Sequence, residues 1–243
     1  MLTPKFMQAY KQQVKWWLKH ESHERAMELL VGGSFDAIGR IEAQLLLQLG
    51  LCDSHFIVDV GCGSGRLAVQ LKESHQGEYL GTDVLPQLLS HAKKLCGRAD
   101  WQFRQVSGTT IPAADECADF VVFFSVLTHL QHEHGFRYLA EAKRVLKPGG
   151  MVVFSFLEYA VDAHWTQFQT MLNDTNPKKV ENVFLGRDAP AVWARHLQFE
   201  LCAQHGGDEA FIRLDRPVTM DDGSVVSGMA SLGQSVCVLR KRA

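Results

Sequence analysis

The stretch Phe56-Ile57-Val58-Asp59-Val60-Gly61-Cys62-Gly63-Ser64-Gly65-Arg66-Leu67-Ala68 decides how this chain folds. It begins as an almost continuous apolar run, which is typical of a strand buried on both faces of a parallel sheet. Three alternate glycines stop the run, and an amphipathic pattern starts directly after them. Glycine has no Cβ, so such a turn adopts backbone angles closed to other residues and lets a ligand lie against the main chain. We therefore predict a strand, a tight ligand-binding turn and a helix.

The spacing of the glycines separates two classes of cofactor. A dinucleotide-binding turn reads G-x-G-x-x-G, and its third glycine would fall at position 66, which is Arg66. The pattern from Asp59 is instead D-x-G-x-G-x-G, and it resembles the first motif of the class I S-adenosylmethionine-dependent methyltransferases. An ordinary tight turn is the alternative for the glycines alone. The resemblance implies that the cofactor lies against Asp59, Gly61, Cys62, Gly63 and Gly65.

The second predicted strand ends in an acidic residue. Glu78 to Asp83 reads as this strand, and Asp83 falls 83 − 65 = 18 residues beyond Gly65. An acidic residue at about this offset, roughly 20 residues, meets a ribose in nucleotide-binding folds. A carboxylate accepts two hydrogen bonds and a ribose diol offers two donors. We predict that Asp83 binds the ribose and that Val84 and Leu85 flank the adenine.

The third predicted strand, Trp101 to Val106, leads to Ser107 and Gly108. In related methyltransferases an aspartate usually stands here and binds the adenine amino group. Ser107 occupies that place in this chain, so the resemblance implies a contact through the backbone of Gly108 rather than through a carboxylate. Both residues are predicted to lie at the cofactor.

Further segments resemble the same family in the same order. Asp119 to Phe124 is a continuous apolar strand, and Ser125-Val126-Leu127-Thr128-His129-Leu130 follows it. A helix from Phe136 to Leu146, a Lys147-Pro148-Gly149-Gly150 turn and a fifth strand from Met151 to Phe156 complete the set. The resemblance covers about Phe56 to Phe156. It implies cofactor contacts from Phe124, Ser125 and Val126.

His129 is the candidate catalytic residue. It follows the carboxyl end of the fourth strand, where open α/β sheets place their ligands. An oxygen or nitrogen acceptor must lose a proton, and an imidazole is suited to take it; a structural histidine is the alternative. His132 and His134 lie close by in sequence, but a zinc site needs three or four converging ligands, so we predict no metal.

The N-terminal part is predicted to be a helical cap. Phe6, Tyr10, Val14 and Trp17 recur at helical spacing from Pro4 to about Leu30, which indicates either a packed amphipathic helix or a lid over the active site. A loop from Val31 to Arg40 and a helix from Ile41 to Leu49 follow. Such loops in related methyltransferases often fold over the methionine end of the cofactor. Arg40 is therefore a candidate partner for its carboxylate, with a solvated arginine as the alternative.

Composition limits the class of protein. The chain has 243 residues, 46% of them hydrophobic and 21% charged, with a formal net charge of −2. This charge provides no field for nucleic acid, and no apolar stretch reaches the roughly 20 residues of a membrane span. The six cysteines stand singly, without a C-x-x-C pair. We expect one cytoplasmic domain, with a cap over 1–50, a cofactor core over 51–160 and closing strands within 161–243.

The predicted fold is a doubly wound α/β sheet of seven mostly parallel strands. The resemblance implies the order 3-2-1-4-5-7-6, with Phe199 to Ala203 and an antiparallel Ser235 to Arg240 as closing strands. The predicted function is transfer of a methyl group from S-adenosylmethionine to a small-molecule acceptor, with S-adenosylhomocysteine as product. Two alternatives remain open: an NAD(P)-dependent oxidoreductase, and a non-catalytic regulatory protein that binds S-adenosylmethionine.

Overall fold

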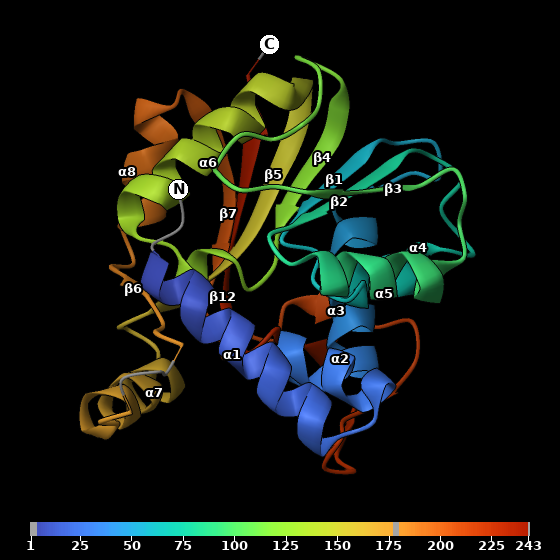
Figure 1. Cartoon of the computed structure of the whole chain (residues 1–243). Coiled ribbons are helices and arrows are strands. Elements are labelled where there is room, and N and C mark those ends of the chain that lie inside the picture. Colours follow the sequence, from blue (N-terminus) through green and yellow to red (C-terminus); the bar gives the residue numbers. More distant parts are fainter. Residues whose placement is uncertain (1–3, 177–179, 243) are drawn as a thin grey trace.

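The computed structural model describes residues 4–176 and 180–242 (Figure 1). Its main sheet runs in the order β3-β2-β1-β4-β5-β12-β7, with the short β6 paired to β5. The strands are parallel except β12, which is antiparallel to both β5 and β7. The predicted order is confirmed, because β7 and β12 are the sixth and seventh strands of the prediction. The sheet comprises β1 Ile57–Val60, β2 Tyr79–Asp83, β3 Gln102–Gln105, β4 Ala118–Phe123, β5 Leu146–Glu158, β6 Phe184–Leu185, β7 Phe199–His205 and β12 Ser235–Lys241.

Helices cover both faces of the sheet. They are α1 Pro4–His20, α2 His23–Val31, α3 Phe35–Gln48, α4 Arg66–Leu71, α5 Pro86–Cys96, α6 His132–Val145, α7 Asp162–Asn173 and α8 Ala189–His196, with a 3₁₀ turn, η1, at Leu127–His129. In Figure 1, α6 and α8 lie on one side of the strands and α3, α4 and α5 on the other, while α7 projects from the body. No helix within the described ranges is long and apolar enough to cross a membrane.

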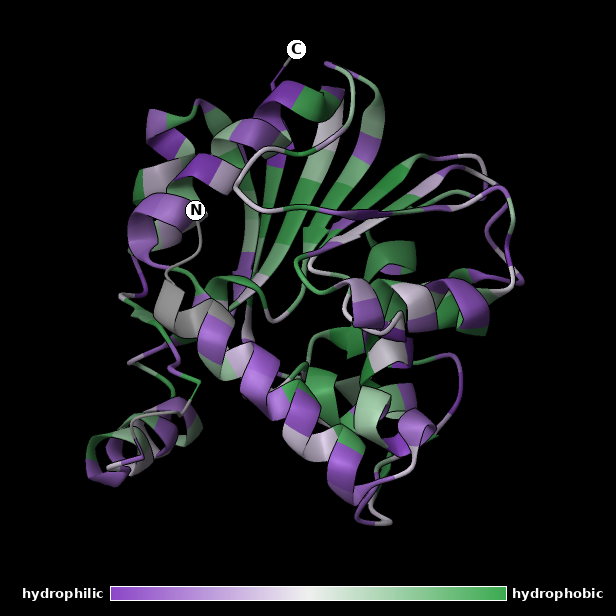
Figure 2. Ribbon diagram, in the orientation of Figure 1, coloured by the Kyte–Doolittle hydropathy of each residue, from purple (hydrophilic) through white to green (hydrophobic). Residues whose placement is uncertain are grey.

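The central strands are buried because both of their faces are apolar. Side chains alternate along a strand, so Phe120 and Val122 of β4 pack with α3 and α4, while Val121 and Phe123 pack with α6. Figure 2 shows the apolar colour concentrated on the strands and the polar colour on the outer faces of the helices. This packing fixes the carboxyl ends of β1, β2 and β4 side by side.

The N-terminal region differs from the prediction in two ways. The single predicted helix is two helices, since α1 ends at His20 and Ser22 caps α2 by accepting a hydrogen bond from the Arg25 amide at 3.3 Å. The predicted loop through Arg40 is wrong, because α3 already begins at Phe35. Gly39 lies inside that helix, where a Cβ would meet the Arg66 carbonyl oxygen at 2.5 Å. This glycine therefore permits close packing of α3 on α4, and it does not indicate a loop.

A small β insertion lies between β7 and β12. It contains β8 Ile212–Arg213, β9 Val218–Thr219, β10 Val225–Val226 and β11 Met229–Ala230, which form two antiparallel pairs. The insertion is tied to α3, because Gln48 exchanges side-chain hydrogen bonds with the backbone of Phe211 and Arg213. A turn at Asp221-Asp222-Gly223 joins β9 to β10, and Gly223 has a positive φ of 84°, which favours glycine.

Candidate functional site

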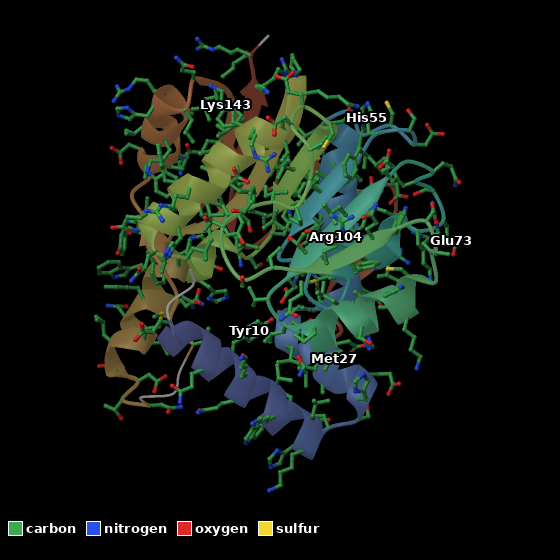
Figure 3. All side chains as sticks on the ribbon, turned by 45° about the horizontal axis from the view of Figure 1, so that its top comes forward. Tyr10, Met27, His55, Glu73, Arg104 and Lys143 are labelled. Carbon is green, nitrogen blue, oxygen red and sulfur yellow. The ribbon has the colours of Figure 1, made fainter. Side chains whose placement is uncertain are left out.

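A cavity of about 350 Å³ opens at the carboxyl ends of β1, β2 and β4. This is the edge of a parallel sheet at which α/β folds bind ligands, and the volume lies in the range of about 300–1,000 Å³ usual for small-molecule sites. Helices α1 and α2 cover the cavity, with Tyr10 and Gln13 of α1 in its lining. Figure 3 shows Tyr10 on the side of α1 that faces the rest of the molecule.

The glycine turn is held by contacts on two sides. Gly61 and Gly63 have positive φ values of 73° and 56°, which favour glycine. A Cβ at Gly61 would meet Val126 Cγ2 at 2.4 Å, and one at Gly63 would meet Val31 Cγ1 at 2.5 Å. The amides of Gly61 and Cys62 both donate to the Thr82 carbonyl, at 2.7 and 2.9 Å. The turn is therefore packed against the loop after β4 and the end of α2, and its amides are fixed on β2.

Asp83 ends β2 and lines the cavity. Its Oδ2 accepts a hydrogen bond from the Gly63 amide at 3.1 Å, and its Oδ1 accepts one from the Leu85 amide at 2.9 Å. A carboxylate has about four lone-pair sites, so each oxygen keeps one for a ligand. Burial raises the pKa of Asp83 to about 6, against the opposing effect of the backbone amides.

Two further buried acidic groups lie beside the turn. Asp59 accepts a hydrogen bond from the Tyr79 hydroxyl, and burial raises the pKa of Asp59 to about 7 although that bond lowers it. Glu42 of α3 forms an ion pair with Arg66, the first residue of α4, and burial raises the pKa of Glu42 against the effect of Arg66. Arg66 also donates to the carbonyls of Val31 and Gly32. This arginine joins the cap to the cofactor turn.

His129 is partly buried and lies in the cavity wall at the end of η1. Its Nδ1 lies 3.3 Å from the carbonyl oxygen of Glu181. Since a carbonyl only accepts, this bond requires the proton on Nδ1 and leaves Nε2 in the acceptor form of a neutral imidazole. Burial lowers the pKa of His129 against the effect of that carbonyl, which favours the neutral ring.

The cavity brings together most of the residues that the sequence predicted for the site. Its lining includes the candidate base together with Asp59, Gly61, Cys62, Gly63, Asp83, Val84, Phe124, Ser125 and Val126. Arg40, Gly65, Leu85, Ser107 and Gly108 are outside the described lining. Leu85 packs in an apolar cluster with α1 and α2, and Gly65 lies against Ala92 of α5, whose Cβ is 3.0 Å from the position of a Cβ at Gly65. The side chain of Phe6 lies outside the described residues.

Several lining residues had no signal in the sequence. Arg66 was noted there only as the absence of a glycine, whereas it is a structural ion-pair partner of Glu42. Tyr138 of α6, together with Val180 and Asn182 after α7, reaches the cavity from distant parts of the chain. Helical periodicity did indicate α1 as a cap. Within the described ranges, no three His, Cys, Asp or Glu side chains converge so as to hold a metal ion.

Comparison with known proteins gives a match for the part of the chain that forms the cavity wall around the glycine turn. Residues 58–154 match the profile of a family described as "Methyltransferase domain". This part of the chain is therefore a methyltransferase domain, and the resemblance of the glycine turn to the class I S-adenosylmethionine-dependent methyltransferases is confirmed there. The chain is 28% identical over 157 residues to the O-methyltransferase resE of Aspergillus sclerotiorum, covering 62% of this chain and 54% of that one. It is 35% identical over 101 residues to the demethylmenaquinone methyltransferase of Deinococcus radiodurans, with 40% and 41% covered. The chain spans about half or less of the length of these relatives.

Solved structures share the fold of this chain. The putative methyltransferase of Haloferax volcanii in complex with the Trm112 methyltransferase activator superposes with a TM-score of 0.66 at 16% identity, over 96% of this chain and 98% of that one. A possible histamine N-methyltransferase of Thermotoga maritima gives a TM-score of 0.62 at 17% identity, over 98% and 99%. At such low identity the likeness concerns the fold, and the predicted Rossmann-like architecture is confirmed.

Proposed function

We propose that this protein transfers the methyl group of S-adenosylmethionine to an oxygen or nitrogen atom of a small-molecule acceptor. The observation that carries the proposal is one covered cavity with the glycine turn and Asp83 in one wall and His129 in another. The methyltransferase domain match over residues 58–154 supports this cofactor, and the geometry of the turn fits it. Glycine is required at positions 61 and 63, where side chains would collide with Val126 and Val31, and the backbone there lines the cavity directly.

Asp83 would hold the ribose. The hydrogen bonds that it accepts from two backbone amides fix the orientation of the carboxylate. The remaining lone pairs are available for the two hydroxyl groups of the ribose. The bound cofactor supplies a methyl group on a positively charged sulfur, which is already an activated leaving group. The protein therefore has to orient the acceptor and exclude water. The cover formed by α1 and α2 is suited to the second task.

His129 would act as the base when the acceptor carries a proton. Its Nδ1 proton is directed at the Glu181 carbonyl, so the ring is oriented and Nε2 can receive the acceptor's proton. One relative is named an O-methyltransferase, and one structural neighbour is titled a possible histamine N-methyltransferase. A carbonyl-oriented, neutral imidazole serves a hydroxyl group and a protonated amine alike, and the proposal covers both.

The proposal is tested by methyl transfer from labelled S-adenosylmethionine to a panel of phenols, carboxylic acids and amines. We expect transfer to at least one class of acceptor. On that acceptor, His129→Gln should lower kcat by about 10²–10⁴-fold while cofactor affinity stays unchanged. His132→Gln is the matched control, because His132 follows in the next helix and its Nε2 contacts the Phe184 carbonyl. Cofactor binding without transfer to any acceptor would favour the non-catalytic regulatory alternative.

A further inference from the structure

Tyr138 of α6 lies against the loop that follows β3. Its side chain is 4% exposed, and its ring packs edge-on against Phe123 with centroids 5.7 Å apart. Its hydroxyl donates a hydrogen bond to the Gly108 carbonyl oxygen at 2.7 Å. Tyr138 also lines the cavity, although no motif in the sequence indicates this position. A buried phenol at a ligand cavity needs an explanation in terms of its hydrogen bonds.

Two valines line the cavity after the ends of β2 and β3, and the second, Val106, stands two residues before Gly108, whose carbonyl accepts the hydrogen bond of Tyr138. Val84 follows Asp83 directly, and the Val106 amide donates to the Asp83 carbonyl at 2.9 Å. Both valines therefore adjoin Asp83, the residue proposed to bind the ribose. The glycine turn and the residues after β4 line the cavity elsewhere. A nucleoside with its ribose on Asp83 and its methionine chain along the turn would direct its base towards the two valines. Ser107, which stands where related proteins carry an aspartate, is not in the described lining.

The hydrogen-bond polarity of Tyr138 is fixed. A hydroxyl has one proton and two lone pairs, and the proton of Tyr138 is directed at the Gly108 carbonyl. Only lone pairs remain for a ligand, so the hydroxyl is an acceptor towards the cavity. Burial, with a smaller effect of Asp83, raises the pKa of Tyr138 to about 12, and the hydroxyl keeps its proton at neutral pH.

We propose that Tyr138 recognises the adenine of the cofactor, its hydroxyl oxygen accepting a hydrogen bond from the exocyclic amino group. Related proteins bind this amino group with an aspartate at the position of Ser107, and in this chain Tyr138 takes that role. The inference rests on the proposed use of S-adenosylmethionine and adds a residue that determines specificity for the base. A nucleobase that carries a hydrogen-bond donor in place of the adenine amino group is favoured, and a nucleobase without such a donor loses the contact with the Tyr138 hydroxyl.

The test measures binding, independently of turnover. Titration calorimetry compares S-adenosylhomocysteine with its 6-deamino analogue, which lacks only the amino group, on the unmodified protein and on Tyr138→Phe. The unmodified protein should bind S-adenosylhomocysteine about threefold to tenfold more tightly than the analogue, the range expected for one hydrogen bond. In Tyr138→Phe this preference should disappear, because the affinity for S-adenosylhomocysteine falls and that for the analogue does not. Tyr159→Phe is the matched control, since Tyr159 is exposed and outside the described lining.

Each outcome separates the two proposals. If Tyr138→Phe weakens both ligands by the same factor, Tyr138 only holds the loop at Gly108 and the inference is overturned. It is likewise overturned if the preference for the amino group persists in the variant. In both cases the proposed use of S-adenosylmethionine stands, because the unmodified protein still binds the ligand. Failure of the unmodified protein to bind either ligand would reject both proposals.

Discussion

Replacing Asp83 by asparagine should weaken cofactor binding while leaving the melting temperature almost unchanged. The Asp83 carboxylate accepts hydrogen bonds from the Gly63 and Leu85 amides, and the residue is only 6% exposed. Asparagine keeps one acceptor oxygen and turns an NH₂ group towards the other amide, which costs about 1–3 kcal/mol of unfolding free energy. The substitution also removes a buried charge. The rise of the Asp83 pKa from 3.8 to about 6 corresponds to a cost of about 3 kcal/mol above pH 6. The two effects on folding are opposite and similar in size.

Binding has no such compensation. The variant loses one charged acceptor for a ribose hydroxyl, and hydrogen bonds to charged groups contribute about 1.5–3 kcal/mol. Affinity for S-adenosylhomocysteine at pH 7.5 should therefore fall by about tenfold to 150-fold. In the unmodified protein affinity should also fall as pH drops below about 6, because protonation removes the charged acceptor. This part of the pH dependence should be absent from Asp83→Asn.

The assay is titration calorimetry from pH 5 to 8, with unfolding followed on the same samples. Asp53→Asn is the control, since Asp53 is exposed in the loop before β1. An affinity of Asp83→Asn within twofold of the unmodified protein would refute the assignment of the ribose to Asp83. So would a variant that retains the full pH dependence.

Two further predictions concern the walls of the cavity. Because the pKa of Asp59 is raised to about 7, the folded state holds more protons than the unfolded state between about pH 4 and 7, and stability falls as pH rises through that window. Asp59→Asn should thus be more stable than the unmodified protein at pH 8, by up to about 4 kcal/mol, and gain much less at pH 5; equal gains in urea unfolding at both pH values would disprove this. Gly61→Ala should abolish cofactor binding, whereas Gly97→Ala, which has a similar positive φ but nothing within 4 Å of its Cβ, should bind normally. Similar affinities for the two alanine variants would mean that crowding by Val126 does not matter.

The parts of the fold predicted correctly are those with a local cause. The strand, glycine turn and helix around Gly61 follow from an apolar run, positive φ and amphipathic spacing within a few residues. The predicted loop through Arg40 is wrong because a glycine such as Gly39 usually indicates a loop in a sequence, whereas here it lies in α3. Glycine is needed at this helical position because a Cβ there would collide with the Arg66 carbonyl oxygen, and Arg66 is distant in sequence.

The rest of the site depends on long-range contacts. The break at Ser22 was missed because the residue three positions later is Arg25, so the Glu or Gln of a capping box is absent there. Tyr138 reaches the cavity only because α6 packs against the loop at Gly108. Arg66 forms its buried ion pair only because α3 brings Glu42 to it. Pairings of this kind have no periodicity or spacing by which a single sequence would reveal them.

The central claim is that the glycine turn and Asp83 form a site for S-adenosylmethionine and not for a nicotinamide dinucleotide. Thermal unfolding of the full chain with S-adenosylmethionine, S-adenosylhomocysteine, NAD or NADP tests this most directly. At a ligand concentration of a hundred times the dissociation constant, binding stabilises the folded state by about 2.7 kcal/mol, which raises Tm by about 5–10 °C for a chain of this size. We expect that rise with the two methionine-derived ligands and no change with NAD or NADP. A rise with the nicotinamide cofactors alone would contradict the account.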